Sequence, residues 1–228
     1  MSCKIVVISC DKNKDLFEPY HICIEKYWKE HPPIIYSTES VANPYYETIC
    51  LNYDIGSWTK RVADTIKDLD CEHILLMVDD IFLREQVNND RFNKLFDFFF
   101  DNVASINLEK SFDSNDIPLT SDLLVRSKLG KWKTSVMCNL FDKKKLLEIL
   151  SFKTTNPWDF EESNNHLNYT FLITKGGDIL NWGYSNRKWF GVRKGKWCKE
   201  IVDFFDKENI KIDYSIRGFY QWKFIYVL

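Results

Sequence analysis

The sequence predicts an α/β domain with a mostly parallel central sheet. Continuous apolar runs at residues 4–8 and 74–78 are typical of strands covered on both faces, as in parallel sheets. Segments with helical periodicity alternate with these runs through the first half of the chain, which is the order of a βαβ domain. The chain has 228 residues, 45% hydrophobic and 28% charged, and this suits one domain with a sizeable core.

The elements of the first half follow from local signals. After the strand at residues 4–8, a helix is expected around residues 16–30, because the prolines at residues 32–33 interrupt helical structure. A short strand is expected at residues 34–36, and residues 37–56, rich in Asn, Pro and Tyr, are expected to form a loop.

Two further helices flank the strand at residues 74–78. Ser57 can cap the first of them, whose apolar positions recur at helical spacing: Trp58, Val62, Ile66 and Leu69. The second helix is expected to bury one apolar face, formed by Phe92, Leu95, Phe96, Phe99 and Val103.

The second half of the chain is less regular. We expect a polar loop at residues 109–122, a strand at 134–141 and a helix at 142–150 with Leu146, Leu147 and Leu150 inward. Two or three short strands are expected within residues 170–197, separated by Gly176-Gly177 and Gly195. Residues 1–170 would form the main α/β region, and residues 171–228 would complete the same domain with strands and a helix.

Composition excludes some classes of protein. The formal net charge of −2 argues against a general nucleic-acid-binding protein. The seven cysteines are scattered singly, so free thiols in a reducing compartment are expected. The first residues do not resemble a signal peptide, and no apolar run reaches the length of a membrane span. These features predict a cytoplasmic protein.

Asp79 and Asp80 directly follow the apolar strand at residues 74–78. Ligands of open α/β sheets bind beyond the carboxyl ends of the strands, and carboxylates there can hold Mg²⁺ or Mn²⁺. Successive strand residues point to opposite faces, so the two side chains can share a ligand only if the backbone turns there. A solvated strand end is the alternative reading of this pair.

A second acidic group lies at residues 156–162, with the sequence Asn-Pro-Trp-Asp-Phe-Glu-Glu. Pro157 can start a helix, and acidic residues in the first turn suit the helix dipole without any further function. The functional alternative is a general base presented at a helix start, beside Trp158 as one wall of a sugar site.

Near the C-terminus, basic residues alternate with aromatic ones. Such a segment can stabilise a leaving diphosphate, or contact an anionic membrane that carries a lipid-linked acceptor. It can also be a solvated hairpin whose charged edges prevent aggregation. The residues concerned are Arg187, Lys188, Arg193, Lys194 and Lys196, among Trp182, Tyr184, Trp189, Phe190 and Trp197.

Taken together, these segments resemble bacterial GT-A-fold glycosyltransferases that build surface polysaccharide and lipopolysaccharide. The resemblance covers residues 4–165 and rests on the order KIVVIS, a Ser-Trp helix start, HILLMVDDIFL, SVMCNLF, KKKLLEIL and NPWDFE. It implies a GT-A-like (Rossmann-like) mixed sheet flanked by helices, with a small β-rich C-terminal extension.

The resemblance also implies roles on the donor side of the site. Asp80 would be the ligand of Mn²⁺ or Mg²⁺, and Asp79 would lie close to the donor sugar or ribose. Val78 stands where the usual Asp-x-Asp motif has its first acid, which leaves fewer carboxylates for the metal. The nucleotide would be contacted by Ser9, Asp11 and Glu39.

On the acceptor side, Glu161 matches the family's general base, with Glu162 as the second choice. Trp158 would line the acceptor pocket, on the same helical face as Glu161, three residues later in the sequence. The diphosphate would be bound by basic residues of the C-terminal segment, namely Arg187, Arg193 and Lys194.

The predicted function is therefore metal-dependent, inverting transfer of a sugar from a nucleotide-diphosphate sugar to an acceptor hydroxyl, in polysaccharide biosynthesis. The acceptor would be a saccharide or a lipid-linked saccharide, reached in the cytoplasm or at the inner face of the membrane. Two alternatives remain open. The acid pair suits a metal-dependent phosphoryl transferase or nuclease, and the departure at Val78 suits a catalytically silent sugar or lipid-head-group binding module.

Overall fold

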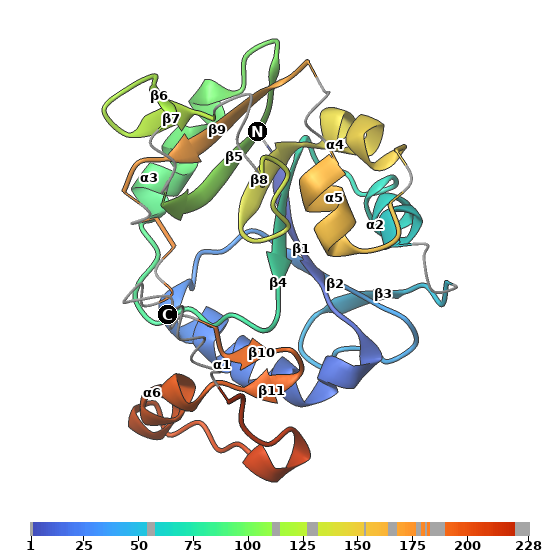
Figure 1. The fold of residues 1–228 in the computed structure, drawn as a ribbon, viewed down its shortest axis with the longest axis vertical. Coiled ribbons are helices and arrows are strands. Elements are labelled where there is room, and N and C mark those ends of the chain that lie inside the picture. Colours follow the sequence, from blue (N-terminus) through green and yellow to red (C-terminus); the bar gives the residue numbers. More distant parts are fainter. Residues whose placement is uncertain are drawn as a thin grey trace, which may run out of the picture.

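The computed structural model describes residues 2–53, 58–110, 115–126, 132–152, 154–163, 168–176, 179–180, 182 and 190–221. Within these residues, nine strands form one sheet in the order β3-β2-β1-β4-β8-β5-β9-β7-β6 (Figure 1). Among them, β7 and β8 run against the direction of the rest. The predicted mixed, mostly parallel sheet flanked by helices is confirmed.

The first half of the chain builds the parallel part of the sheet. Its elements are β1 (Cys3–Ile8), η1 (Asp11–Leu16), α1 (Phe17–Tyr27), β2 (Ile34–Thr38), β3 (Glu47–Cys50), α2 (Trp58–Ile66) and β4 (His73–Val78). The predicted strands and helices are confirmed, whereas Ser57, the predicted helix cap, lies outside the described residues. The loop predicted for residues 37–56 is wrong in part. It contains β3, a short edge strand without buried residues, so no apolar run signals it.

The middle of the chain crosses to the other side of the sheet. It contains α3 (Asn89–Lys94), η2 (Leu95–Phe98), β5 (Val103–Lys110), β6 (Ile117–Pro118), β7 (Leu123–Val125), β8 (Asn139–Asp142), α4 (Lys143–Leu150), α5 (Pro157–Ser163) and β9 (Thr170–Thr174). The helix predicted to include Val103 ends earlier, and Val103 begins β5. Ser105 and Asn107 are completely buried in β5 and interrupt the apolar run that would have indicated a strand.

Two other predictions for this region need correction. The predicted loop at residues 109–122 contains the end of β5 and all of β6. The predicted strand at residues 134–141 is formed only from Asn139 onward, because the preceding residues turn toward α5, where the Thr134 hydroxyl donates to the Phe160 carbonyl at 2.9 Å. The helix predicted at 142–150 is confirmed with Asp142 as its cap, although Leu147 is only half-buried.

The C-terminal region contains a small antiparallel hairpin and short helices. These are β10 (Val192–Arg193), β11 (Lys196–Trp197), η4 (Lys199–Ile201), α6 (Val202–Lys207) and η5 (Tyr214–Ile216). Lys194 and Gly195 form the hairpin turn with φ of 51° and 74°, the left-handed backbone that such two-residue turns require. The predicted C-terminal strands are confirmed, and all seven cysteines are free, as predicted.

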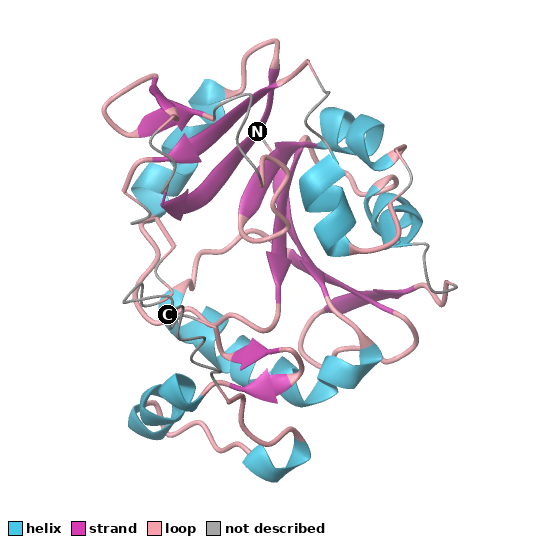
Figure 2. Ribbon diagram, viewed as in Figure 1, coloured by secondary structure: helices cyan, strands magenta, loops and turns pink. Residues whose placement is uncertain are grey.

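Helices lie on both sides of the sheet (Figure 2), and a hydrophobic cluster lies on each of its faces. Helices α2, α4 and α5 pack on one face through residues such as Val62, Leu146 and Phe160. Helix α1, helix α3 and the C-terminal region cover the other face, with Tyr20, Phe92 and Phe205 in one cluster. The carboxyl ends of β1, β2, β4 and β5 lie together along one edge, which we call the carboxyl edge.

The C-terminal hairpin packs against the chain just beyond β4. The Asp80 carbonyl accepts the backbone N–H groups of Gly191 and Val192 at 2.9 and 3.1 Å. Ile81 forms a bridge with Phe190. A Cβ atom at Gly191 would lie 2.1 Å from the Phe82 ring, so the two segments approach as closely as glycine permits.

Gly191→Ala is therefore expected to destabilise the protein by about 1–3 kcal/mol, the usual cost of overpacking a well-packed contact. The added methyl group must displace the buried Phe82 ring or separate the hairpin from Asp80. Denaturant unfolding measures the change. Gly195→Asn is the control, because nothing lies within 4 Å of a Cβ atom there and Asn tolerates left-handed backbone. Equal stability of both variants would contradict the close contact between Gly191 and the Phe82 ring.

Candidate active site at the carboxyl edge

Asp79 lies in the turn after β4 and is 1% exposed. Its carboxylate accepts hydrogen bonds from the Ser9 hydroxyl and, at 2.8 Å, from the Asn13 side-chain amide. Burial, with a further contribution from the charge of Asp80, raises the pKa of Asp79 to about 7 against the lowering effect of its hydrogen bonds. The end of β1 therefore positions this acid.

Asp80 follows in the same turn and is half-buried. Its backbone carbonyl binds the C-terminal hairpin, as described above, whereas its carboxylate accepts its own backbone N–H. Burial raises the pKa of Asp80 to about 6, against the lowering effect of its own backbone N–H and of the charge of Arg217. The side chain is thus available to a ligand.

These carboxylates suit a divalent metal only if a substrate supplies further ligands. Among the described residues, no group of three or more His, Cys, Asp or Glu side chains is arranged to hold a metal. Mg²⁺, however, is commonly held by one or two carboxylates together with substrate phosphates. Two adjacent carboxyl groups, one buried and one half-buried, whose pKa values are both raised by burial are compatible with such an ion.

Ser9, Asp11 and Glu39, predicted as nucleotide contacts, lie together at the ends of β1 and β2. The Asp11 N–H donates to Glu39 at 2.6 Å, and the Asp11 carboxylate accepts the N–H groups of Ser40 and Val41 at 2.9 Å each. Hydrogen bonds lower the pKa of Asp11 to about 2, and the bond from the Ser40 hydroxyl has the largest effect. The network fixes the loop that follows β2.

Arg61 completes this network and was not predicted. It lies on α2, is 8% exposed, and donates to Glu39 at 2.6 Å and to the Ser9 carbonyl at 3.0 Å. Arginine on a helix is usually solvent-exposed, so its position in the sequence does not indicate this role.

Glu161, the predicted base, is 9% exposed on α5, and its carboxylate accepts the Val136 N–H at 2.8 Å. Burial raises the pKa of Glu161, while hydrogen bonds from Val136 and Ser135 lower it. Because β8 runs antiparallel to β4 and begins opposite Leu76, residues preceding β8 lie at the edge where β4 ends. Glu161 is therefore held at the carboxyl edge, as the acid pair is.

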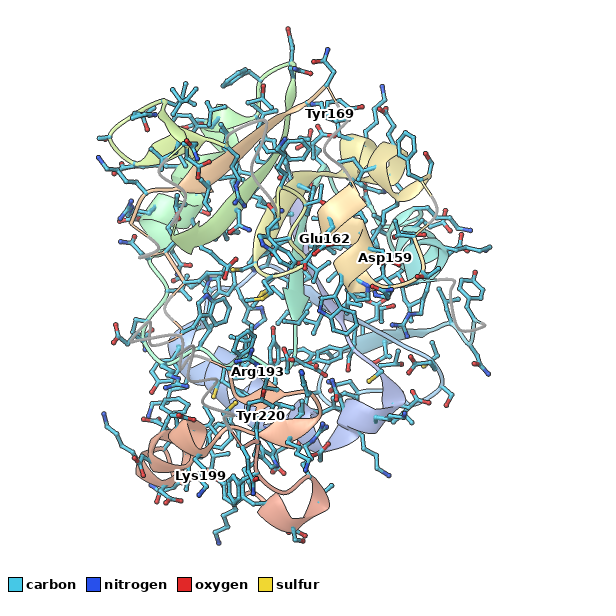
Figure 3. The ribbon with its side chains drawn as sticks, in the orientation of Figure 1. Asp159, Glu162, Tyr169, Arg193, Lys199 and Tyr220 are labelled. Carbon is cyan, nitrogen blue, oxygen red and sulfur yellow. The ribbon has the colours of Figure 1, made fainter. Side chains whose placement is uncertain are left out.

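Helix α5 begins at Pro157, as predicted, with the Asn156 side chain accepting the Asp159 N–H at 2.9 Å. Trp158 is 67% exposed, whereas Glu161, three residues later on the same helix, is buried. The short helix buries its far turn against residues 134–136 and leaves its first turn in solvent. Glu162, the second choice of base, is exposed (Figure 3).

Glu109 is a further acid at this edge that sequence reasoning missed. It lies near the end of β5, in a segment expected to be a loop. Burial, with a further contribution from the charge of Glu161, raises the pKa of Glu109 to about 7 against the lowering effect of Arg126. Because the sequence does not predict β5, it does not indicate that Glu109 lies at the end of a strand.

The predicted diphosphate-binding residues are placed in part. Arg187 lies outside the described residues. The Arg193 guanidinium lies 5.8 Å from the Phe190 ring centroid and 5.3 Å from that of Tyr220 (Figure 3). Lys194 is exposed in the hairpin turn. Arg217, which was not predicted, approaches the acid pair from the C-terminal side.

No model of a known protein family matches the sequence, and no curated protein sequence matches it. Among solved structures, a fragment of S. aureus TarS in complex with UDP superposes with a TM-score of 0.50 at 12% identity, over 76% of this chain and 57% of that one. An active-site mutant of LgtC gives 0.45 at 11% identity, over 75% and 71% of the two chains. A cytidylyltransferase from Leptospira borgpetersenii gives 0.43 at 10% identity, over 72% and 69%.

The likeness to the TarS fragment is a likeness of fold, and this chain has the GT-A-like fold that its sequence predicts. The chain spans about 57% of the length of that fragment. Within the part of the chain that the structure describes, no helix is long and apolar enough to cross a membrane.

Proposed function

We propose that this chain transfers a sugar from a nucleotide-diphosphate sugar to an acceptor hydroxyl. The observation that carries the proposal is the placement of Asp79 and Asp80 at the end of β4, with Asp79 held by Ser9 after β1 and by Asn13 on η1. In an open α/β sheet this edge is where nucleotide ligands bind. The Asp11–Glu39–Arg61 network lies at the same edge and is suited to hold the nucleoside.

On the donor side, Asp80 would hold Mn²⁺ or Mg²⁺ and Asp79 would orient the donor sugar or ribose. The metal would neutralise negative charge on the diphosphate as it leaves. Arg193 and Lys194, on the hairpin that packs against Asp80, would add positive charge beside it, as would Arg187.

On the acceptor side, Glu161 would remove the proton from the attacking hydroxyl, which displaces the nucleoside diphosphate from the opposite face of the sugar and inverts the anomeric carbon. The bond from Val136 fixes the orientation of the Glu161 carboxylate. Trp158 and Glu162 would line the entry of a saccharide or lipid-linked saccharide acceptor. A role in polysaccharide biosynthesis, with peripheral contact at the inner face of the membrane, belongs to the same proposal.

A thermal-shift screen of nucleoside diphosphates and nucleotide sugars, with and without Mn²⁺, tests this function. A ligand at about 100 times its dissociation constant should stabilise the native state by roughly 2.7 kcal/mol. We expect a shift that requires both nucleotide and metal, followed by slow hydrolysis of the matching nucleotide sugar in the absence of acceptor.

Other outcomes of the screen favour the two alternatives. Binding of sugars or lipid head groups without donor hydrolysis would favour a silent binding module. Metal-dependent cleavage of phosphate esters, with no response to nucleotide sugars, would favour a phosphoryl transferase.

A further inference from the structure

Arg217 joins the C-terminal segment to η1, across 202 residues of sequence. Its Nε donates to Asp15 Oδ2 at 2.7 Å and its Nη2 donates to Asp15 Oδ1 at 2.5 Å. Nη2 also donates to the Lys12 carbonyl at 2.9 Å. The Arg217 and Asp15 side chains are 8% and 16% exposed, so this bidentate pair is largely withdrawn from water.

The Arg217 guanidinium also contacts the residue that holds Asp79. Nη2 lies 3.1 Å from Asn13 Oδ1, and Asn13 Nδ2 donates to Asp79 Oδ1 at 2.8 Å. Only one orientation of the amide satisfies both neighbours. If the amide were flipped, its NH₂ group would face the guanidinium donors and its oxygen would face the carboxylate.

The same C-terminal region contacts the other acid of the pair. The N–H groups of Gly191 and Val192 bind the Asp80 carbonyl. Farther along, Trp197 and Gly218 are joined by an N–H···O bond of 3.0 Å, which connects the hairpin to the residue after Arg217. The C-terminal segment therefore contacts both acids of the pair. It binds the backbone carbonyl of Asp80 directly, and it contacts Asp79 through Asn13.

We propose that Arg217 is a positioning residue of the donor site, which fixes the Asn13 amide so that it donates to Asp79. The geometry of the acid pair then depends on the docked C-terminal segment, although that segment is farthest from β4 in the sequence. The consequence for donor binding rests on the function proposed above, whereas the Arg217–Asn13–Asp79 arrangement does not.

Arg217→Met tests the arrangement, with Lys26→Met as the matched control. Lys26 pairs with Glu208 and therefore also ties the C-terminal region to the N-terminal part of the chain, but it has no contact with the acid pair. The probe is the side-chain NH₂ signal of Asn13 in a ¹H–¹⁵N spectrum, assigned by its loss in Asn13→Ser. We expect this signal to shift or broaden in Arg217→Met and to stay unchanged in Lys26→Met. An unchanged Asn13 signal in a folded Arg217→Met protein would overturn the proposal.

Calorimetric titration with UDP and Mn²⁺ gives the functional readout. Loss of a charge-assisted contact should weaken binding about tenfold in Arg217→Met and leave Lys26→Met unaffected. In an Asn13→Ser background, Arg217→Met should add little, because the relay is already broken. Fully additive losses would mean that Arg217 acts on the ligand directly, against a positioning role. UDP could bind neither the wild type nor the variants while the Asn13 signal still responds as expected. That result would contradict the proposed donor binding and leave the positioning role of Arg217 in place.

Discussion

Asp80→Asn is expected to abolish the Mn²⁺-dependent part of nucleoside diphosphate binding while the protein remains folded. The contacts of Asp80 within the fold are made by its backbone carbonyl, which asparagine retains. Burial raises the pKa of its carboxyl group to about 6 despite the hydrogen bond from its own backbone N–H and the charge of Arg217, so a neutral amide removes a charge that the fold does not favour. A metal site, in contrast, is weakened by this change, because a neutral amide oxygen binds a hard cation less strongly than a carboxylate does.

The measurement is a nucleoside diphosphate titration of wild type and Asp80→Asn, each with and without Mn²⁺, with denaturant unfolding to confirm stability. Asp79→Asn is the less informative variant. The Asp79 carboxylate accepts bonds from Ser9 and Asn13, so an NH₂ group there would face a donor and reduce stability. Wild-type, metal-dependent binding by Asp80→Asn would exclude Asp80 as the ligand.

The parts of the fold that the sequence predicts well are those decided by local apolar patterns. Strands β1 and β4 are continuous apolar runs, and α2 and α4 have clear helical periodicity. Strand β5 was missed because Ser105 and Asn107 occupy buried positions that usually hold apolar residues. Such polar residues are tolerated only because of their tertiary surroundings, and these surroundings are not visible in a single sequence.

The residues of the candidate site likewise include some that the sequence could place and some that it could not. Residues that directly follow strands, such as Asp79 and Ser9, could be placed at the carboxyl edge from the sequence, since the ends of parallel strands meet there. Arg61 and Arg217 could not, because each reaches the site from another element through its guanidinium. Their contacts depend on how α2 and the C-terminal segment pack, which no local pattern encodes.

Glu161→Gln is expected to lower turnover by about 10²–10⁴-fold, the usual contribution of a positioned general base, with nearly unchanged donor affinity. The substitution is well suited to this site. A Gln side-chain oxygen can still accept the Val136 N–H, so the contact between α5 and the segment before β8 is retained. What is lost is the ability to take a proton from the acceptor hydroxyl.

The pH dependence of turnover is an independent test of Glu161 as the general base. Burial raises the pKa of Glu161 above its ordinary value, and a base acts only when it is deprotonated. Turnover of the wild type should therefore rise with pH as Glu161 loses its proton, and this rise should disappear in Glu161→Gln.

Glu162→Gln is the matched control, since its side chain is exposed and one residue away on the same helix. Neighbouring helical residues point about 100° apart, so both acids cannot serve one hydroxyl. If both carboxylates only stabilise the start of α5, each substitution should cost about 0.3–1 kcal/mol of stability and little turnover. Steady-state rates of sugar transfer by the two variants separate these cases. A near-normal rate for Glu161→Gln would assign its buried carboxylate to fixing α5 against residues 134–136, and the base would then have to be sought elsewhere on the carboxyl edge, first at Glu109.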